Sequence, residues 1–137
     1  MDSLIFMQET FDFIIAGGGM AGLSLAFYLN ESDKLRNKKV LIVDRDAKTG
    51  NDHTWCFWEK SSGAFEKIIF RKWQTIRFHG TRGFSESLSL GEYEYKMIRA
   101  ADFYKFVFGK IKQNPNFTFL QNEIISVKNG IVETNEN

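Results

Sequence analysis

The chain has 137 residues, of which 43% are hydrophobic and 26% charged, so it is typical of a folded domain rather than a disordered polymer. Its net charge of +1 gives no electrostatic reason to expect nucleic acid as a partner. The single cysteine excludes an internal disulfide. We therefore expect one domain over residues 1–137.

The first predicted element is a buried strand over residues 11–16, "FDFIIA", because the run is short, apolar and ended by glycines. Residues 13–29 form a stretch of 17 residues without a charge. The segment before this stretch lacks the Lys or Arg of a secretory signal. Three consecutive glycines within the stretch itself would weaken a spanning helix. A membrane span or signal peptide is therefore disfavoured.

A glycine-rich turn follows the strand directly. Gly17, Gly19 and Gly22 match the pattern G-x-G-x-x-G, and the next residues predict a helix over 20–29. "KVLIV" (39–43) predicts a second buried strand, and Asp44 stands at its carboxyl end. The order strand, glycine turn, helix, strand, acid is typical of a dinucleotide-binding unit in an α/β, Rossmann-like fold with a parallel sheet.

Each part of this unit has a physical role. Gly17 permits the tight turn, Gly19 lets a pyrophosphate approach the backbone, and Gly22 lets the helix pack close to the strand. The helix N-terminus offers free N–H groups and a positive dipole end to phosphates. Asp44 is placed to accept hydrogen bonds from ribose hydroxyls, which disfavours a 2′-phosphate and hence NADP at this site. These residues leave FAD and NAD as open alternatives.

The stretch "NDHTWCFWE" (51–59) is the next notable feature. A strand over 54–59 would place Trp55 and Phe57 on one face and Cys56 with Trp58 on the other. We expect Cys56 to be a small buried hydrophobe. His53 has no partner at metal-ligand spacing, so we expect no metal site. The aromatic residues would serve as core or would line a binding surface.

Taken together, "DFIIAGGGMAGLSLAFYL", "VLIVDRD" and "NDHTWCFWE" resemble the N-terminus of the bacterial lycopene β-cyclases, which are flavoproteins of carotenoid synthesis. The segment "TWCFW" carries the specificity, and "YKMIRAADFYKFV" (95–107) adds a weaker similarity. The resemblance implies FAD as cofactor, in its reduced form, with NAD(P)H as reductant. It implies cofactor contacts from the following residues: Gly17, Gly18, Gly19, Met20, Ala21, Gly22, Asp44, Arg45, Arg99 and Ile125.

The reaction implied by the resemblance is redox-neutral. An acid protonates the end of linear lycopene, the cation closes to a β-ionone ring, and a proton leaves. Trp55, Phe57 and Trp58 would line the substrate, and Glu59 is the one nearby ionisable group that would reach the reacting centre. The family's catalytic carboxylate is expected in a downstream motif that this sequence lacks. We therefore expect an N-terminal fragment, an incomplete domain that is inactive alone and either poorly soluble or weak in FAD binding.

The second half of the sequence predicts further strands over 67–70, 75–80, 87–90 and 93–98, and an amphipathic helix over 100–113. "FTFL" (117–120) is expected to join the parallel sheet. Asn129-Gly130 between two apolar runs predicts a hairpin. Arg99 has a second interpretation, as a surface charge at the start of the helix.

Three other functions remain open from the sequence. They are a flavin monooxygenase or reductase, a non-catalytic dinucleotide-binding module, and an NAD dehydrogenase. For the cyclase, the expected partner is a lipophilic substrate dissolved in a membrane, and the expected location is cytoplasmic, with peripheral attachment to the inner membrane.

Overall fold

The computed structural model describes residues 9–135, whose contacts divide the chain into two compact units. Of the described residues, 9–48 and 107–135 form the first unit, and Thr49–Phe106 form the second. From the sequence we expected one domain, and the two units are described separately below.

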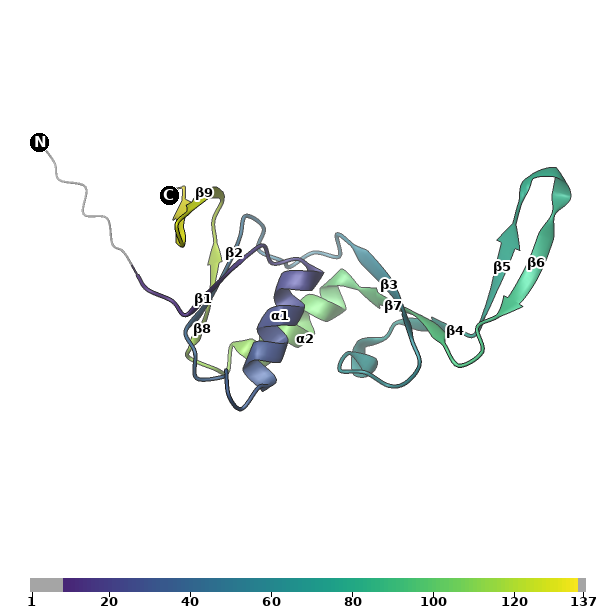
Figure 1. Cartoon of the computed structure of the whole chain (residues 1–137), viewed down its shortest axis with the longest axis horizontal. Helices are drawn as coiled ribbons and strands as arrows, with labels where there is room; N and C mark the ends of the chain where they lie inside the picture. Colours follow the sequence, from purple (N-terminus) through teal and green to yellow (C-terminus); the bar gives the residue numbers. More distant parts are fainter. Residues whose placement is uncertain (1–8, 136–137) are drawn as a thin grey trace, which may run out of the picture. The chain divides into compact units, whose positions relative to one another are not determined.

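A three-stranded parallel sheet forms the centre of the first unit (Figure 1). Its strands lie in the order β1 (Phe13–Ala16), β2 (Val40–Asp44) and β8 (Phe117–Gln121). The register aligns Ile15 with Ile42, and Ile42 with Phe119. The predicted strands are therefore present within two residues at each end, and "FTFL" joins the sheet in parallel as expected.

Helix α1 (Met20–Glu31) connects β1 to β2 and supplies much of the core of this unit. Parallel strands require such a crossover, because a short turn cannot return the chain to the starting edge of the sheet. The fully or nearly fully buried residues of α1 and the first two strands are Leu23, Ala26, Phe27, Leu29, Ile15, Val40, Ile42 and Val43.

The first unit ends in an antiparallel hairpin of β9 (Ile124–Lys128) and β10 (Ile131–Thr134). Asn129 and Gly130 have φ values of 50° and 76°, which is the left-handed geometry that a two-residue hairpin turn needs. The Asn-Gly prediction is confirmed.

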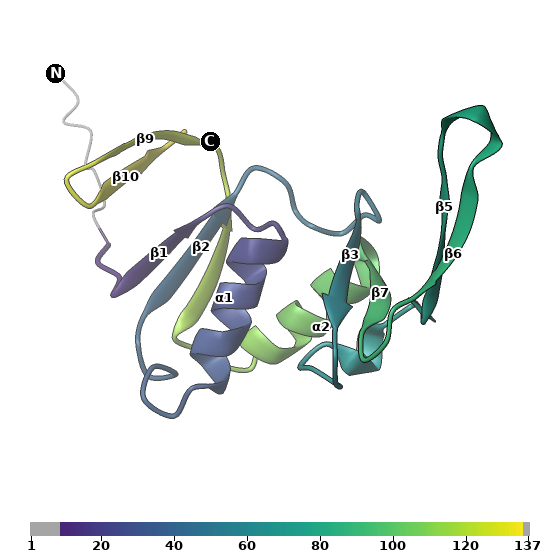
Figure 2. The same ribbon diagram turned by 45° about the vertical axis from the view of Figure 1, so that its right-hand side comes forward.

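The second unit contains an antiparallel sheet with the order β3 (Thr54–Glu59), β7 (Glu94–Arg99) and β4 (Arg71–Trp73). Strands β5 (Thr75–His79) and β6 (Ser85–Ser89) form a separate hairpin, joined by the short helix η2 (Thr81–Gly83) (Figure 2). Helix α2 (Ala100–Ile111) follows β7 directly.

The predicted strand over 67–70 is wrong. Helix η1 (Glu66–Ile68) begins this segment, and the strand lies at β4 instead. Backbone hydrogen bonds from Ile68 to Phe65 and from Ile69 to Glu66 form a helical turn where the apolar run "KIIF" alone favours extended backbone. Glu66 also bonds to two lysines of the unit, Lys72 and Lys96.

Candidate functional site

The turn between β1 and α1 has the geometry that its glycines suggested. Gly17 has φ +106°, a region that residues with a side chain rarely adopt, and its N–H donates to the carbonyl of Val43 at 2.8 Å. The first glycine therefore bends the chain immediately after β1 while remaining bonded to β2.

Gly22 marks the closest approach of α1 to this turn. A Cβ at Gly22 would lie 1.9 Å from the carbonyl oxygen of Gly17 and 3.1 Å from Cγ2 of Ile15. No side chain fits in that space, so the third glycine is required by packing. The contact brings the first turn of the helix against the end of β1.

Gly19, the N-cap of α1, faces open space, since an added Cβ would meet no atom within 4 Å. No side chain caps the helix, and its first turn contains no acidic residue. The first N–H groups of any helix lack intrahelical partners, and they carry the positive end of the helix dipole. This end of α1 is therefore open to an anionic group.

Asp44, the last residue of β2, lies against the same turn. Its Oδ2 accepts a hydrogen bond from the N–H of Gly18 at 2.6 Å, and its Oδ1 accepts one from the N–H of Asp46 at 2.8 Å. The ammonium of Lys48 lies 3.2 Å from Oδ1. Burial alone would raise the pKa of Asp44, but these bonds outweigh it, so the pKa lies below its ordinary value.

These residues fit the ADP part of a dinucleotide on the observations above. The uncapped helix end and the bare backbone at Gly19 suit a pyrophosphate. The charged Asp44 carboxylate has about four acceptor positions, of which the contacts named above use three, so one can accept a ribose hydroxyl. Lys48 is a site residue that the sequence did not reveal, because a lysine four positions after an acid in a loop has no distinctive pattern.

Three of the other expected cofactor residues lie close to this turn in the sequence and in the fold. Met20 and Ala21 begin α1, and Arg45 is exposed directly after β2. Ile125 belongs to β9 in the same unit, and its side chain is exposed. The expected contacts of these four residues with a cofactor therefore stay predictions.

In the second unit, β3 has the alternation that the sequence predicted. Trp55 is half-buried, and its ring meets Phe103 and Tyr104 edge-on at 5.3 and 5.8 Å between centroids. Trp58 is exposed on the other face and packs against Tyr95. The aromatic residues of β3 therefore do not form one continuous surface, and Trp55 is part of the packing against α2.

Cys56 is exposed, so the expectation that it is a buried hydrophobe is wrong. It shares the solvent-facing side of β3 with Trp58, as the two-residue period of a strand requires. His53 stacks on Trp55 with ring planes 8° apart, and its Nδ1 lies 2.8 Å from Asp52. Tyr104 also donates to Asp52, at 3.1 Å, so this histidine belongs to a polar contact that joins the start of β3 to α2.

Glu59 has a partner that the sequence did not indicate. Lys96 of β7 is fully buried, and its ammonium donates to Glu59 at 2.8 Å, to Glu66 at 2.7 Å and to the carbonyl of Ser61 at 3.1 Å. Glu94 lies 3.4 Å away. Burial disfavours the ammonium, but the bonds to Glu59 and Glu66 outweigh this, so the pKa of Lys96 is raised.

Arg99, the last residue of β7, lines a pocket of the second unit. Its Nε donates to Asp102 at 2.7 Å, and its guanidinium lies 4.1 Å from the centre of the Phe70 ring. Lys67, Lys105 and Phe106 line the same pocket. Arg99 is thus held by neighbours at the start of α2, and its expected contact with a flavin remains a prediction.

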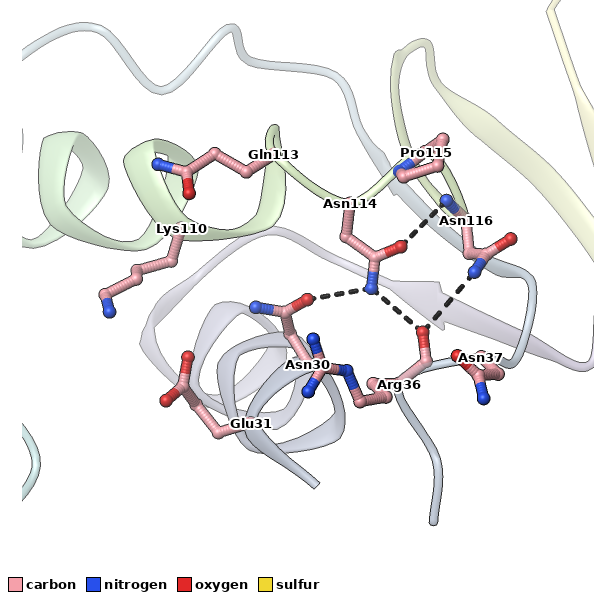
Figure 3. Close-up of a pocket in the computed structure, with 9 residues that line it drawn as sticks. All are labelled: Asn30, Glu31, Arg36, Asn37, Lys110, Gln113, Asn114, Pro115 and Asn116. Atoms are coloured by element: carbon pink, nitrogen blue, oxygen red, sulfur yellow. Dashed lines mark hydrogen bonds between the residues drawn. The ribbon is translucent and has the colours of Figure 1, made fainter. Parts of the chain in front are cut away.

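A polar pocket of about 530 Å³ lies at the other end of α1, far from the glycine turn along the helix (Figure 3). Asn114 donates to Asn30 at 2.9 Å and to the carbonyl of Arg36 at 2.8 Å. It also accepts from the N–H of Asn116 at 3.0 Å. These hydrogen bonds connect the turn before β8 to the end of α1 and to the loop after it. We therefore interpret the pocket as a structural contact between these segments.

Two general features of residues 9–135 complete the description. No group of three His, Cys, Asp or Glu side chains in this range is arranged to hold a metal ion. Neither of the two α-helices found there has the length and apolar character needed to cross a bilayer.

Comparisons with known proteins agree with the sequence resemblance. The model of the family described as "Lycopene cyclase protein" matches residues 12–136. Glucose oxidase from Penicillium chrysogenum is 41% identical over 44 residues, which are 32% of this chain and 7% of that enzyme.

The fold also matches solved structures. PqsL of Pseudomonas aeruginosa, described as a probable FAD-dependent monooxygenase, has a TM-score of 0.62 and 16% identity. A multiply substituted PqsL has a TM-score of 0.65 and 14% identity. Both comparisons cover 86% of this chain but only 35% of the solved one, so the chain spans about a third of those structures. At this identity the similarity establishes an α/β fold with a parallel sheet.

Proposed function

Because the chain belongs to the lycopene cyclase family, whose model matches residues 12–136, we propose that it binds the ADP part of FAD on β1, α1 and β2 in a Rossmann-like arrangement. The observation that carries this proposal is the joint position of the uncapped helix end and the charged Asp44, which are linked by the Gly18–Asp44 hydrogen bond of 2.6 Å. The description of PqsL as FAD-dependent supports the same cofactor.

In this proposal different residues of the turn bind different parts of the cofactor. The N–H groups at the start of α1 bind the pyrophosphate, and the bare Gly19 lets it reach the backbone. Asp44 accepts from the ribose, while the Gly18 and Asp46 N–H groups hold its carboxylate in position. Lys48 forms an ion pair with Asp44 and so partly neutralises the carboxylate's negative charge.

The reaction that we propose for the family fold is the conversion of the linear ends of lycopene to β-ionone rings. A proton is added to an end double bond, the chain closes to a ring, and a proton leaves, so no electrons are consumed overall. When bound, reduced FAD supplies negative charge that stabilises the cationic transition state, and NAD(P)H keeps it reduced. Lycopene is lipophilic, so the complete enzyme would meet its substrate at a membrane from the cytoplasmic side.

Glu59 is a poor candidate for the acid that starts this reaction. Its carboxylate accepts a hydrogen bond from the buried ammonium of Lys96 at 2.8 Å, so it is already engaged in the ion cluster of the second unit. We therefore assign Glu59 to the packing of the second unit and not to the proton transfer.

Binding of FAD, FMN and ADP to the purified chain tests the cofactor proposal. FAD and ADP should compete for one site, whereas FMN, which lacks the adenosine half, should bind far more weakly. An Asp44→Asn variant should weaken FAD by about tenfold, because it loses a charged hydrogen-bond acceptor for the ribose. Equal binding of FMN and FAD would exclude the glycine turn as the site.

A second candidate function is a flavin monooxygenase, which the similarity to PqsL favours. A longer protein containing this chain distinguishes the two. The cyclase should change red lycopene to an orange-yellow product without net consumption of NADPH or O2. A monooxygenase should consume both in proportion to product.

A further inference from the structure

The β5–β6 hairpin has two chemically different faces. The register pairs Ile76 with Leu88 and Phe78 with Glu86, and successive residues of a strand point to opposite faces. Ile76, Phe78 and Leu88 therefore share one face with a single carboxylate, that of Glu86. Phe84, at the tip, meets Phe78 edge-on at 6.4 Å between ring centroids. The opposite face carries only polar and basic residues: Thr75, Arg77, His79, Ser85, Ser87 and Ser89.

The apolar face is uncovered in the described part of the chain. Phe78 is 57% exposed, Phe84 52% and Leu88 43%, and all of β6 is exposed. Among the described strands, β5 and β6 pair only with each other. Exposed apolar patches of this kind mark interaction surfaces, and an isolated two-stranded hairpin is marginally stable without a partner on its apolar face.

The charges around the tip indicate what the partner is. Residues 79–85 contain Arg82 and His79 but no Asp or Glu, and Arg77 lies on the polar face, where it donates to Ser87 at 3.3 Å. Glu86 is the one carboxylate on the two strands; it is the cross-strand partner of Phe78, on the same face and next to the tip. Aromatic rings that project from a basic, acid-free tip match a bilayer surface that contains anionic lipids.

We propose that the tip of the β5–β6 hairpin inserts Phe78 and Phe84 into the interface of an anionic membrane. Arg77 and Arg82 then lie at the level of the lipid headgroups, and the carboxylate of Glu86, beside Phe78 on the same face, limits insertion to the interface. The proposal extends the proposed function, whose substrate is dissolved in the membrane. Its test uses neither flavin nor lycopene, so either idea can fail without the other.

The purified chain is sedimented with vesicles of phosphatidylcholine, with and without phosphatidylglycerol. The wild type should bind, with higher affinity for the anionic vesicles. The double variant Phe78→Ser with Phe84→Ser should bind both vesicles at least about tenfold more weakly, because it loses two half-exposed aromatic side chains. Arg77→Gln with Arg82→Gln should lose only the preference for anionic lipid. Val127→Ser removes an equally exposed apolar residue from the β9–β10 hairpin and should have no effect.

A second measurement leaves every apolar residue in place. In a Cys56→Ser background, Thr81→Cys at the tip is labelled with an environment-sensitive dye, whose emission should shift to the blue on anionic vesicles. Absence of vesicle binding by the wild type, or binding that the tip variants do not change, would overturn the proposal. So would self-association without lipid that the phenylalanine variant abolishes, since the face would then bind a second copy of the chain.

Discussion

A substitution at Gly22 tests the packing of the glycine turn separately from its proposed binding of the cofactor. Replacing it with alanine places a Cβ 1.9 Å from the carbonyl oxygen of Gly17, a backbone atom that cannot rotate away. Gly19→Ala is the matched control, because the Cβ it adds meets no atom within 4 Å and the φ of −74° is ordinary. Both changes add one methyl group to the same turn.

The expected loss of stability follows from two opposing effects. Overpacking of a dense site costs about 1–3 kcal/mol, and more when backbone has to move. Alanine returns up to about 1 kcal/mol of helix propensity relative to glycine. Gly22→Ala should therefore lower the free energy of unfolding by about 1–2 kcal/mol, whereas Gly19→Ala should change it by less than about 0.5 kcal/mol.

Urea unfolding followed by far-UV circular dichroism measures this difference. Tryptophan fluorescence serves as an internal control, because Trp55, Trp58 and Trp73 all lie in the second unit. Gly19→Ala should keep the stability and lose affinity for FAD, since its methyl group projects into the space proposed for the pyrophosphate. Equal stability of Gly22→Ala and the wild type would refute the close approach of helix and strand.

Three further predictions concern the ion cluster, acid stability and the second hairpin. Lys96→Met should destabilise the second unit by about 1–3 kcal/mol, because it removes the buried cation that Glu59 and Glu66 share. Glu59→Gln should cost less than about 1 kcal/mol, since Lys96 keeps its other partners; tryptophan fluorescence in urea measures both, and equal losses would contradict the proposed cluster. The pKa values of Asp44 and Glu66 are lowered by their hydrogen bonds, so their contribution to stability is complete above about pH 4–4.5 and is lost as the pH falls through the lowered values. Thermal melts should thus be constant from about pH 7 to 5 and fall below about pH 4, and a loss between pH 7 and 5 would show that other groups dominate. Gly130→Ala should cost about 1–2 kcal/mol, because alanine is strained at φ +76°. Faster amide exchange over residues 124–134 would reveal it, and unchanged exchange would contradict the observed turn.

The sequence was sufficient where the signal is local. Gly17, the paired strands of the parallel sheet and the Asn129-Gly130 turn follow from backbone preferences and short apolar runs, and the structure contains them. The alternation of β3 was also predictable, because a strand has a fixed period of two residues.

The features that the sequence did not predict depend mainly on residues that are distant in the sequence. Nothing near Lys96 distinguishes it from a surface lysine, yet it is buried because Glu59 and Glu66 lie 37 and 30 positions away and bond to it. The same contact gives Glu59 a structural role, and it involves Glu66, the first residue of helix η1. The prediction that Cys56 is buried was wrong for another reason. It rested on the residue type, whereas Cys56 lies on the exposed face of β3.

The central claim is that the glycine turn and Asp44 form one site for the ADP part of FAD. Titration of isotope-labelled chain with FAD, followed through backbone amide resonances, tests it most directly and detects weak binding as well. The largest shifts should occur at residues 17–22 and 44–48, and ADP should reproduce them. FAD-dependent shifts confined to other segments, or none at saturating ligand, would contradict it.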